Sequence, residues 1–196
     1  MKTKLGTAAF LFVALFVTTF FQTASAVTLA ELKLKAPLEE HRGWCVDLFG
    51  HLTGGIPAGG FQGHNCFLYD AEQPTEDQGF DSEMFLDDGV IRLVHFDICM
   101  TLHETSAGSF VASEPCTGED IQKFAVKDTG EIVSVAAPDL CLTVGTRIVT
   151  GGGGSPIHLI RQLSFENCDS SIAERQQWEL RYTYEESVPT LPRPYQ

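Results

Sequence analysis

Residues 168–178, with the sequence Cys-Asp-Ser-Ser-Ile-Ala-Glu-Arg-Gln-Gln-Trp, end a stretch that occurs in three versions along the chain. Each version has a first cysteine, a second cysteine, and then a glutamine two residues before an aromatic residue. The three sets are Cys45, Cys66 and Gln78-Gly79-Phe80; Cys99, Cys116 and Gln122-Lys123-Phe124; and Cys141, Cys168 and Gln176-Gln177-Trp178. A repeat of about 40 to 50 residues indicates a small unit that cannot bury its apolar face alone. We therefore expect three units around one shared core.

The first unit offers two candidates for the glutamine-aromatic motif, because Glu83-Met84-Phe85 lies close to Gln78-Gly79-Phe80. The number of residues between the motif and the first cysteine of the next unit decides between the two candidates. Gln78 precedes Cys99, the first cysteine of the second unit, by 21 residues, and Gln122 precedes Cys141, the first cysteine of the third unit, by 19. Glu83 would precede Cys99 by only 16 residues. We therefore assign the motif to Gln78.

The N-terminal residues 1–26 have the pattern of a secretory signal peptide. Lys2 and Lys4 precede an apolar run, and Ala24-Ser25-Ala26 has the small-residue spacing of a cleavage site before Val27. An uncleaved anchor is the alternative, although the apolar run is short for a span of about 20 residues. No other segment is long and apolar enough to cross a bilayer, so we expect a secreted or periplasmic protein without membrane insertion.

The chain after residue 26 is strongly acidic. It keeps 11 basic and 26 acidic residues, a formal net charge of −15, against −13 for the full chain. The negative electrostatic field of such a chain repels phosphate groups. We therefore expect neither nucleic acid nor an anionic membrane as a partner. The 170 residues suit one domain with a sizeable core.

Six cysteines after an export signal indicate disulfides. Each unit holds two, so the economical pairing is Cys45 with Cys66, Cys99 with Cys116 and Cys141 with Cys168. Metal ligation is the alternative, but the cysteines stand singly and no Cys-x-x-Cys occurs. Each bridge closes a loop of 17 to 27 residues and contributes about 3 kcal/mol in the chain-entropy model.

Short apolar runs recur every 8 to 12 residues or so, which is typical of an all-β sandwich or barrel. Asp87-Asp88-Gly89 and Asp128-Thr129-Gly130 are typical of hairpin turns. Residues 27–40 are expected to form a lead-in that lies on the domain, although residues 29–34 could also carry a helical period. Residues 151–156 are expected to form a loop inside the third unit, and residues 185–196 a disordered tail.

The three cysteine pairs and glutamine-aromatic motifs resemble the ricin B-type lectin domain over residues 41–184. The resemblance implies an all-β fold, the β-trefoil, with three pseudo-symmetric four-stranded units and one disulfide in each. In that family the motif residues are chiefly structural. The resemblance therefore implies core positions for Phe80, Phe124 and Trp178, and bracing roles for Gln122 and Gln176.

The same resemblance implies a sugar site in the first unit, where an acid and an amide meet sugar hydroxyls and a ring packs on the sugar face. The family positions fall on Asp47, Gln62, His64, Asp77 and Gln78, with Asn65 as an additional donor. Two departures stand out. His64 replaces the usual Trp or Tyr, and Asp77 replaces an Asn that could donate.

The corresponding positions of the other units lack this combination. They are Thr101, Ala112, Glu114 and Ile121 in the second unit, and Thr143, Ser164, Glu166 and Arg175 in the third. We therefore expect a ligand only in the first unit, a weakly bound galactose-type or other glycan. The alternative for this site is that Asp47 is a surface acid and that Gln62 and His64 only close a loop.

No sequence feature favours catalysis or a cofactor. A Gly-x-Ser-x-Gly elbow and a spare thiol are missing, although paired carboxylates for glycoside hydrolysis stay open because their spacing is three-dimensional. Eight acids in residues 70–88 offer calcium ligands without EF-hand spacing, so a solvated acidic loop is preferred. We expect a non-enzymatic carbohydrate-binding module without metal. The alternative is a degenerate trefoil that serves as a protein-interaction or targeting subunit of a toxin or hydrolase.

Overall fold

The computed structural model describes residues 27–50, 59–68, 73–152 and 154–182. The expected signal peptide and C-terminal tail lie outside these residues. In the described ranges, no helix combines the length and the apolar character that crossing a bilayer requires.

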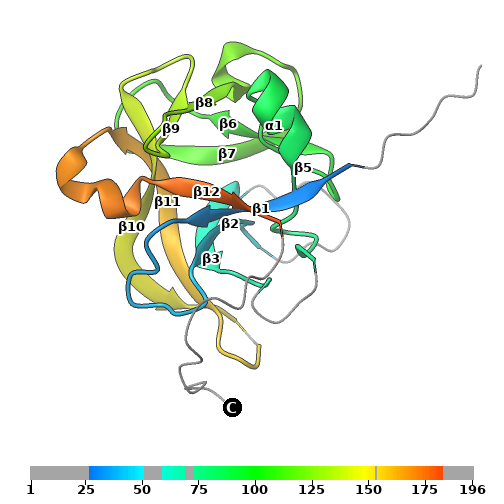
Figure 1. The fold of residues 1–196 in the computed structure, drawn as a ribbon, viewed down its shortest axis with the longest axis vertical. Helices are drawn as coiled ribbons and strands as arrows, with labels where there is room; N and C mark the ends of the chain where they lie inside the picture. Colours follow the sequence, from blue (N-terminus) through cyan, green and yellow to red (C-terminus); the bar gives the residue numbers. More distant parts are fainter. Residues whose placement is uncertain (1–26, 51–58, 69–72, 153, 183–196) are drawn as a thin grey trace, which may run out of the picture.

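Twelve strands occur in the described residues, four from each unit (Figure 1). They are β1 (Leu29–Leu34), β2 (Trp44–Leu48), β3 (Phe61–Asn65) and β4 (Phe80–Asp81); β5 (Arg92–Leu93), β6 (Ile98–Leu102), β7 (Ser109–Pro115) and β8 (Phe124–Val126); and β9 (Ile132–Ser134), β10 (Leu140–Thr150), β11 (Leu159–Asn167) and β12 (Trp178–Arg181). Helix α1 (Ser82–Asp88) and two 3₁₀ helices, η1 (Asp120–Gln122) and η2 (Ser170–Arg175), complete the structure.

The first and fourth strands of the three units form a closed ring. β1 pairs with β12 and β4, β4 with β5, and β8 with β9. Single bridges, Val90 to Lys123 and Glu131 to Gln177, close the remaining gaps. The second and third strands form three hairpins, β2–β3, β6–β7 and β10–β11, and β11 also pairs with β3 and β7. A six-stranded barrel capped by three hairpins is the β-trefoil, as the sequence predicts.

The motif glutamines make the same hydrogen bonds in all three units. Each side-chain amide donates to the backbone oxygen of the residue before the second cysteine and accepts from the backbone N–H of the residue after it. The acceptors are Asn65, Pro115 and Asn167, and the donors are Phe67, Thr117 and Asp169. This threefold agreement confirms Gln78, rather than Glu83, as the first motif residue.

The predicted disulfides are present in the structure. Cys45–Cys66, Cys99–Cys116 and Cys141–Cys168 each join the second strand of a unit to the end of its hairpin, with a Cα–Cα distance of 5.0 Å in every case. The equal geometry in three places follows from the pseudo-symmetry. Disulfides of this kind indicate an oxidising compartment.

The motif aromatics fill the common core. Phe80, Phe124 and Trp178 are all at most 2% exposed. Phe124 stacks on Phe165 with ring centroids 5.4 Å apart, and the Trp178 indole nitrogen donates to the Leu142 carbonyl oxygen at 2.9 Å. Side chains from all three units therefore share one apolar interior, so no unit buries its apolar face by itself.

Two local expectations are wrong. Residues 29–34 form the strand β1, which pairs with three strands, so the sheet begins before residue 41; Ala30, Leu32 and Leu34 alternate inward with the period of two of a strand. Asp87-Asp88-Gly89 ends helix α1 rather than forming a hairpin. Gly89 has φ 72° and its N–H bonds to the Phe85 carbonyl, because a left-handed glycine caps a helix as readily as it forms a turn.

The turn at 128–130 is confirmed, since it connects β8 and β9. The β10–β11 hairpin is longer than its two counterparts, and Figure 1 shows it extending along β2 and β3. Ile160, Arg161 and Gln162 of β11 lie opposite His64, Gly63 and Gln62 of β3. The third unit therefore extends over the hairpin of the first.

Candidate functional site

The strand register places the predicted site residues at equivalent points of the three hairpins. Asp47 lies opposite Gln62, Thr101 opposite Ala112 and Thr143 opposite Ser164. Two positions along each hairpin, on the same face, the first cysteine lies opposite His64, Glu114 or Glu166. One backbone frame therefore presents three different sets of side chains.

The first unit holds a carboxylate in this frame. Asp47 is 2% exposed, and its two oxygens accept from different amides: Oδ1 from Gln62 Nε2 at 2.8 Å and Oδ2 from Gln78 Nε2 at 3.0 Å. A carboxylate has about four lone-pair directions, so two stay open to further donors. The two amides thus fix the carboxylate in place and leave it able to accept.

Burial raises the pKa of the Asp47 carboxyl well above its usual range. The nearby charges of Asp77 and Glu31 act in the same direction, while the bonds from Gln62 and Gln78 offset part of the effect. A buried carboxylate pays a desolvation cost that further hydrogen-bond donors would reduce. The site is therefore suited to a ligand that donates several hydrogen bonds.

Gln62 offers an open acceptor next to this carboxylate. Its Nε2 donates to Asp47, so the other amide atom is the oxygen, which is buried and has no hydrogen-bond partner among the described residues. An unpaired buried carbonyl costs about 1 to 3 kcal/mol. A hydroxyl group in the adjacent cavity would satisfy it.

His64 is a neutral ring at this site. Its Nδ1 lies 2.8 Å from the Asn65 carbonyl oxygen and therefore carries the proton, which makes Nε2 an acceptor. Burial lowers the pKa of His64 from 6.5 to about 4, with a further lowering from His158. At neutral pH the ring offers an uncharged aromatic face.

A cavity of about 370 Å³ joins these groups, and a volume of this size fits a small ligand. Asp47, Gln62, His64 and Asp77 line it, together with Phe67, His158 and the start of the β10–β11 loop at Gly151 and Gly152. The ring centroid of His64 lies 4.9 Å from that of Phe67 and 5.0 Å from that of His158. Polar acceptors and an aromatic wall therefore face one space.

Asn65 and Gln78, the other two predicted residues, are not among those that line the cavity. The Asn65 side-chain oxygen accepts from the Leu159 N–H at 2.8 Å and so anchors the start of β11. Gln78 is fully buried behind Asp47. Their part in the site is to position its walls.

Phe67 and His158 are site residues that the sequence does not reveal. Phe67 follows Cys66 directly, so its proximity to the site could have been noticed. His158 belongs to the third unit, and only the longer cysteine spacing there, 27 residues against 21 and 17, signals that a hairpin projects further. Its direction depends on the tertiary structure.

A second cavity, of about 430 Å³, adjoins the first and shares Leu48, Gly50 and Asp77 with it. His95 and Phe96 line its far side, with ring centroids 4.6 Å apart. Thr75 donates to Asp77 Oδ1 at 2.7 Å and fixes this shared carboxylate. The two cavities therefore have a common wall, and residues of the second unit close the second one.

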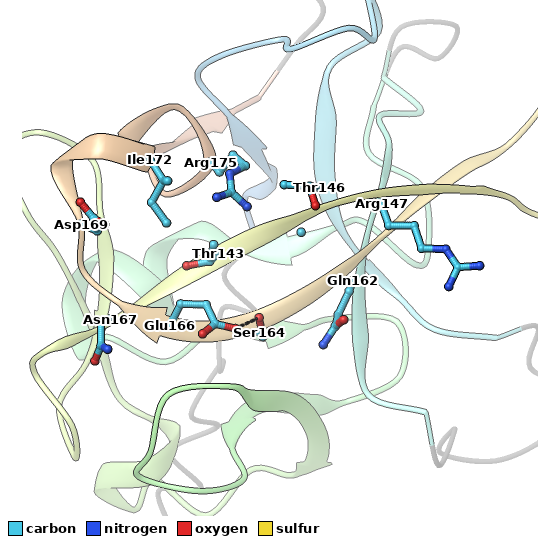
Figure 2. A pocket seen from close by; sticks show the side chains of 11 residues that line it. Thr143, Thr146, Arg147, Gln162, Ser164, Glu166, Asn167, Asp169, Ile172 and Arg175 are labelled. Carbon is cyan, nitrogen blue, oxygen red and sulfur yellow. Dashed lines mark hydrogen bonds between the residues drawn. The ribbon is translucent and has the colours of Figure 1, made fainter.

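The third unit has a cavity of about 470 Å³ in the equivalent place (Figure 2). Thr143 takes the place of Asp47, and its hydroxyl accepts from Gln176 Nε2 at 2.9 Å. Ser164 replaces Gln62 and donates to Glu166 at 2.7 Å. The four positions compared in the sequence all line this cavity, although their chemistry differs from that of the first unit.

Comparisons with known proteins support the fold. No protein-family model matches the chain, and a search of curated protein sequences finds no match. The β-trefoil lectin of the Vibrio vulnificus hemolysin/cytolysin, solved with N-acetyl-D-lactosamine, is similar with a TM-score of 0.52 and 16% identity, over 83% of this chain and 99% of that one. The agglutinin from Abrus precatorius also has a TM-score of 0.52 and 16% identity, over 82% and 51%.

A non-toxic homologue of type II RIPs from Momordica charantia (bitter gourd), solved with α-methyl-D-galactoside, is 20% identical with a TM-score of 0.48. The alignment covers 71% of this chain and 44% of that one, so the chain spans about half the length of the two plant proteins. At 16% identity, the two matches with a TM-score of 0.52 identify the β-trefoil fold.

Proposed function

We propose that this β-trefoil protein is a carbohydrate-binding module without catalytic function, whose sugar site is the cavity of the first unit. The observation that supports this most directly is the unpaired Gln62 oxygen beside the fixed Asp47 carboxylate. Both accept hydroxyl donors, and the rings of His64, Phe67 and His158 offer apolar faces to sugar C–H groups. Lectins with the same fold bind galactose derivatives, as the bitter gourd and Vibrio complexes illustrate.

The test is a titration of the isotope-labelled protein with galactose, N-acetyl-lactosamine and a wider glycan set, followed by NMR. We expect dissociation constants between about 10 μM and 1 mM, with shifts concentrated at the first-unit cavity. The informative variant is Asp47→Thr, because threonine occupies the equivalent position of both other units and accepts from the motif glutamine there.

Asp47→Thr should keep the fold and lose at least tenfold in affinity, since a hydrogen bond to a charged group contributes about 1.5 to 3 kcal/mol. Thr101→Ser in the second unit is the matched control and should bind as the parent does. Equal responses of the parent and Asp47→Thr would refute the assigned site. No response to any glycan would refute the function.

A protein-interaction role is the second candidate, and the surface of the long hairpin favours it. Ile148, Val149 and Ile157 on this hairpin are each about 40% exposed. An apolar hairpin surface is typical of contacts with another protein. Co-purification of one defined partner from the native source, without any glycan response, would select this function.

Export is part of the proposal, with cleavage before Val27. The three disulfides require an oxidising compartment, which agrees with a signal peptide at residues 1–26. N-terminal sequencing of the protein recovered outside the cytoplasm should begin at Val27. An intact Met1 in that material would contradict cleavage.

A further inference from the structure

The third-unit cavity is lined by charged side chains of both signs, the arginines Arg147 and Arg175 and the carboxylates Glu166 and Asp169. Six arginines lie in the described residues. Four pair with carboxylates: Arg42 with Glu40, Arg92 with Asp97, Arg161 with Glu39 and Arg181 with Glu31. The other two, Arg147 and Arg175, form no ion pair with any described residue, and both line this cavity.

The surrounding charge makes this arrangement unusual. The full chain has a net charge of −13, so carboxylates are abundant on its surface. The Arg175 guanidinium donates one long, weak hydrogen bond, of 3.5 Å, to the Val144 carbonyl oxygen. A partly buried guanidinium with donors to spare is suited to an external carboxylate, which it can bind through two parallel hydrogen bonds.

The rest of the lining is suited to hydroxyl groups. Figure 2 shows Thr143 between the Arg175 side chain and the bonded Ser164–Glu166 pair. Glu166 keeps one oxygen for further donors, and Gln162 and Asn167 at the rim both donate and accept. The cavity therefore combines a cationic group with several groups that pair with a polyhydroxylated ring.

From this arrangement we infer that the third-unit cavity is a second ligand site, which takes a sugar bearing a carboxylate. The carboxylate pairs with Arg175, with Arg147 adding to the local positive charge, and ring hydroxyls donate to Glu166. A singly charged carboxylate suits the site better than a doubly charged phosphate, because the acidic protein repels each added negative charge. The site differs from that of the first unit, where Asp77 holds the position of Arg175.

The experiment compares D-galacturonate with D-galactose, which differ only in a carboxylate in place of the hydroxymethyl group. With labelled protein and NMR at 50 mM salt, we expect galacturonate to bind at least fivefold more tightly, with shifts at Thr143 and Ser164. Arg175→Gln should abolish this preference, and Arg175→Lys should keep part of it as a point charge. Arg92→Gln, which alters an ion-paired arginine elsewhere, should leave it unchanged.

The salt dependence of the parent protein gives a second measurement that does not rely on the folding of a variant. Raising the salt to 0.5 M should reduce galacturonate binding severalfold and leave galactose binding unchanged. The Asp47→Thr variant, impaired in the first unit, should retain the galacturonate response, which separates this site from the proposed function. Equal affinity for the two sugars, tighter binding of galactose 6-phosphate, or a preference that survives the double change Arg147→Gln with Arg175→Gln would overturn the inference.

Discussion

Gln78 donates its side-chain amide to the Asp47 carboxylate at 3.0 Å, and this bond joins the structural repeat to the candidate sugar site. In the other units the equivalent glutamines donate to the hydroxyls of Thr101 and Thr143. The scaffold therefore has one recurrent anchor point, and the residue placed on it decides which chemistry a unit presents.

Removing a motif glutamine should destabilise the protein through its buried partners. Gln78→Ala leaves the Phe67 N–H without its side-chain acceptor, removes one of the hydrogen bonds that the Asn65 carbonyl oxygen accepts, and leaves the Asp47 carboxylate with one amide fewer. We expect a loss of about 2 to 4 kcal/mol in the free energy of unfolding, measured by urea denaturation. Gln122→Ala should behave alike, while the exposed Gln73→Ala serves as the control. A loss below 1 kcal/mol for Gln78→Ala would show that the anchor is dispensable.

Acidification should weaken the fold through His64. Between pH 6.5 and about 4 the unfolded chain protonates this imidazole and the folded protein does not, so the free energy of unfolding falls as the pH falls through this window. The raised pKa of Asp47 has the opposite sign, because the folded carboxyl takes up a proton before the unfolded one does.

The variant His64→Phe isolates the histidine contribution, since it keeps a ring and removes the titrating group. We compare the free energy of unfolding of the parent with that of this variant. As the pH falls from 7.5 to 4, the parent should lose roughly 3 kcal/mol relative to the variant. Urea denaturation at several pH values measures it. A constant difference across that range would contradict the lowered pKa.

Arg181 should matter because its partner is buried. Glu31 is fully buried, accepts from Arg181 Nε at 2.9 Å, and receives the Leu68 N–H at 3.0 Å. Arg181→Met leaves this carboxylate without its counter-charge and should cost about 3 to 5 kcal/mol at neutral pH.

Lower pH should restore part of that loss, since burial already raises the pKa of Glu31 and the folded state gains stability as the carboxyl is protonated. The double variant Glu31→Gln with Arg181→Met should be more stable than Arg181→Met alone, because glutamine still accepts from Leu68 without a charge. Thermal denaturation at pH 7 and pH 5 tests both statements. A double variant no more stable than the single one would show that the charge is not the cause.

His158 should contribute to ligand affinity in the first unit although it belongs to the third. His158→Ala removes the ring that lies edge-on to His64, and we expect a severalfold weaker sugar response with a change in stability below about 1 kcal/mol. His103→Ala, which alters an exposed histidine packed on Phe110, is the matched control. If His158→Ala binds sugar with the same affinity as the control His103→Ala, the long hairpin does not form part of the site.

The threefold repeat was accessible from the sequence because it rests on local chemistry. Paired cysteines and glutamine-aromatic motifs recur at similar spacing, so the disulfide partners, the motif residues and the equivalence of Asp47, Thr101 and Thr143 follow from counting along the chain. Residues 29–34 were misjudged because six residues cannot distinguish a strand from a lead-in until their partner β12, about 150 residues later, is placed. Gly89 was misjudged because one left-handed glycine serves both a turn and a helix end.

What the sequence alone determined is the repeated unit and its bridges and, through the resemblance to the lectin family, the polar groups Asp47 and Gln62, which the structure places opposite each other on β2 and β3. Only the tertiary structure decided which walls surround them. The extension of β10–β11 brings His158 against His64, and the folding of the third unit gathers Arg175 and Glu166 around one cavity. Contacts between units depend on how three similar hairpins pack at the end of a closed barrel, and spacing along the chain carries no information about that packing.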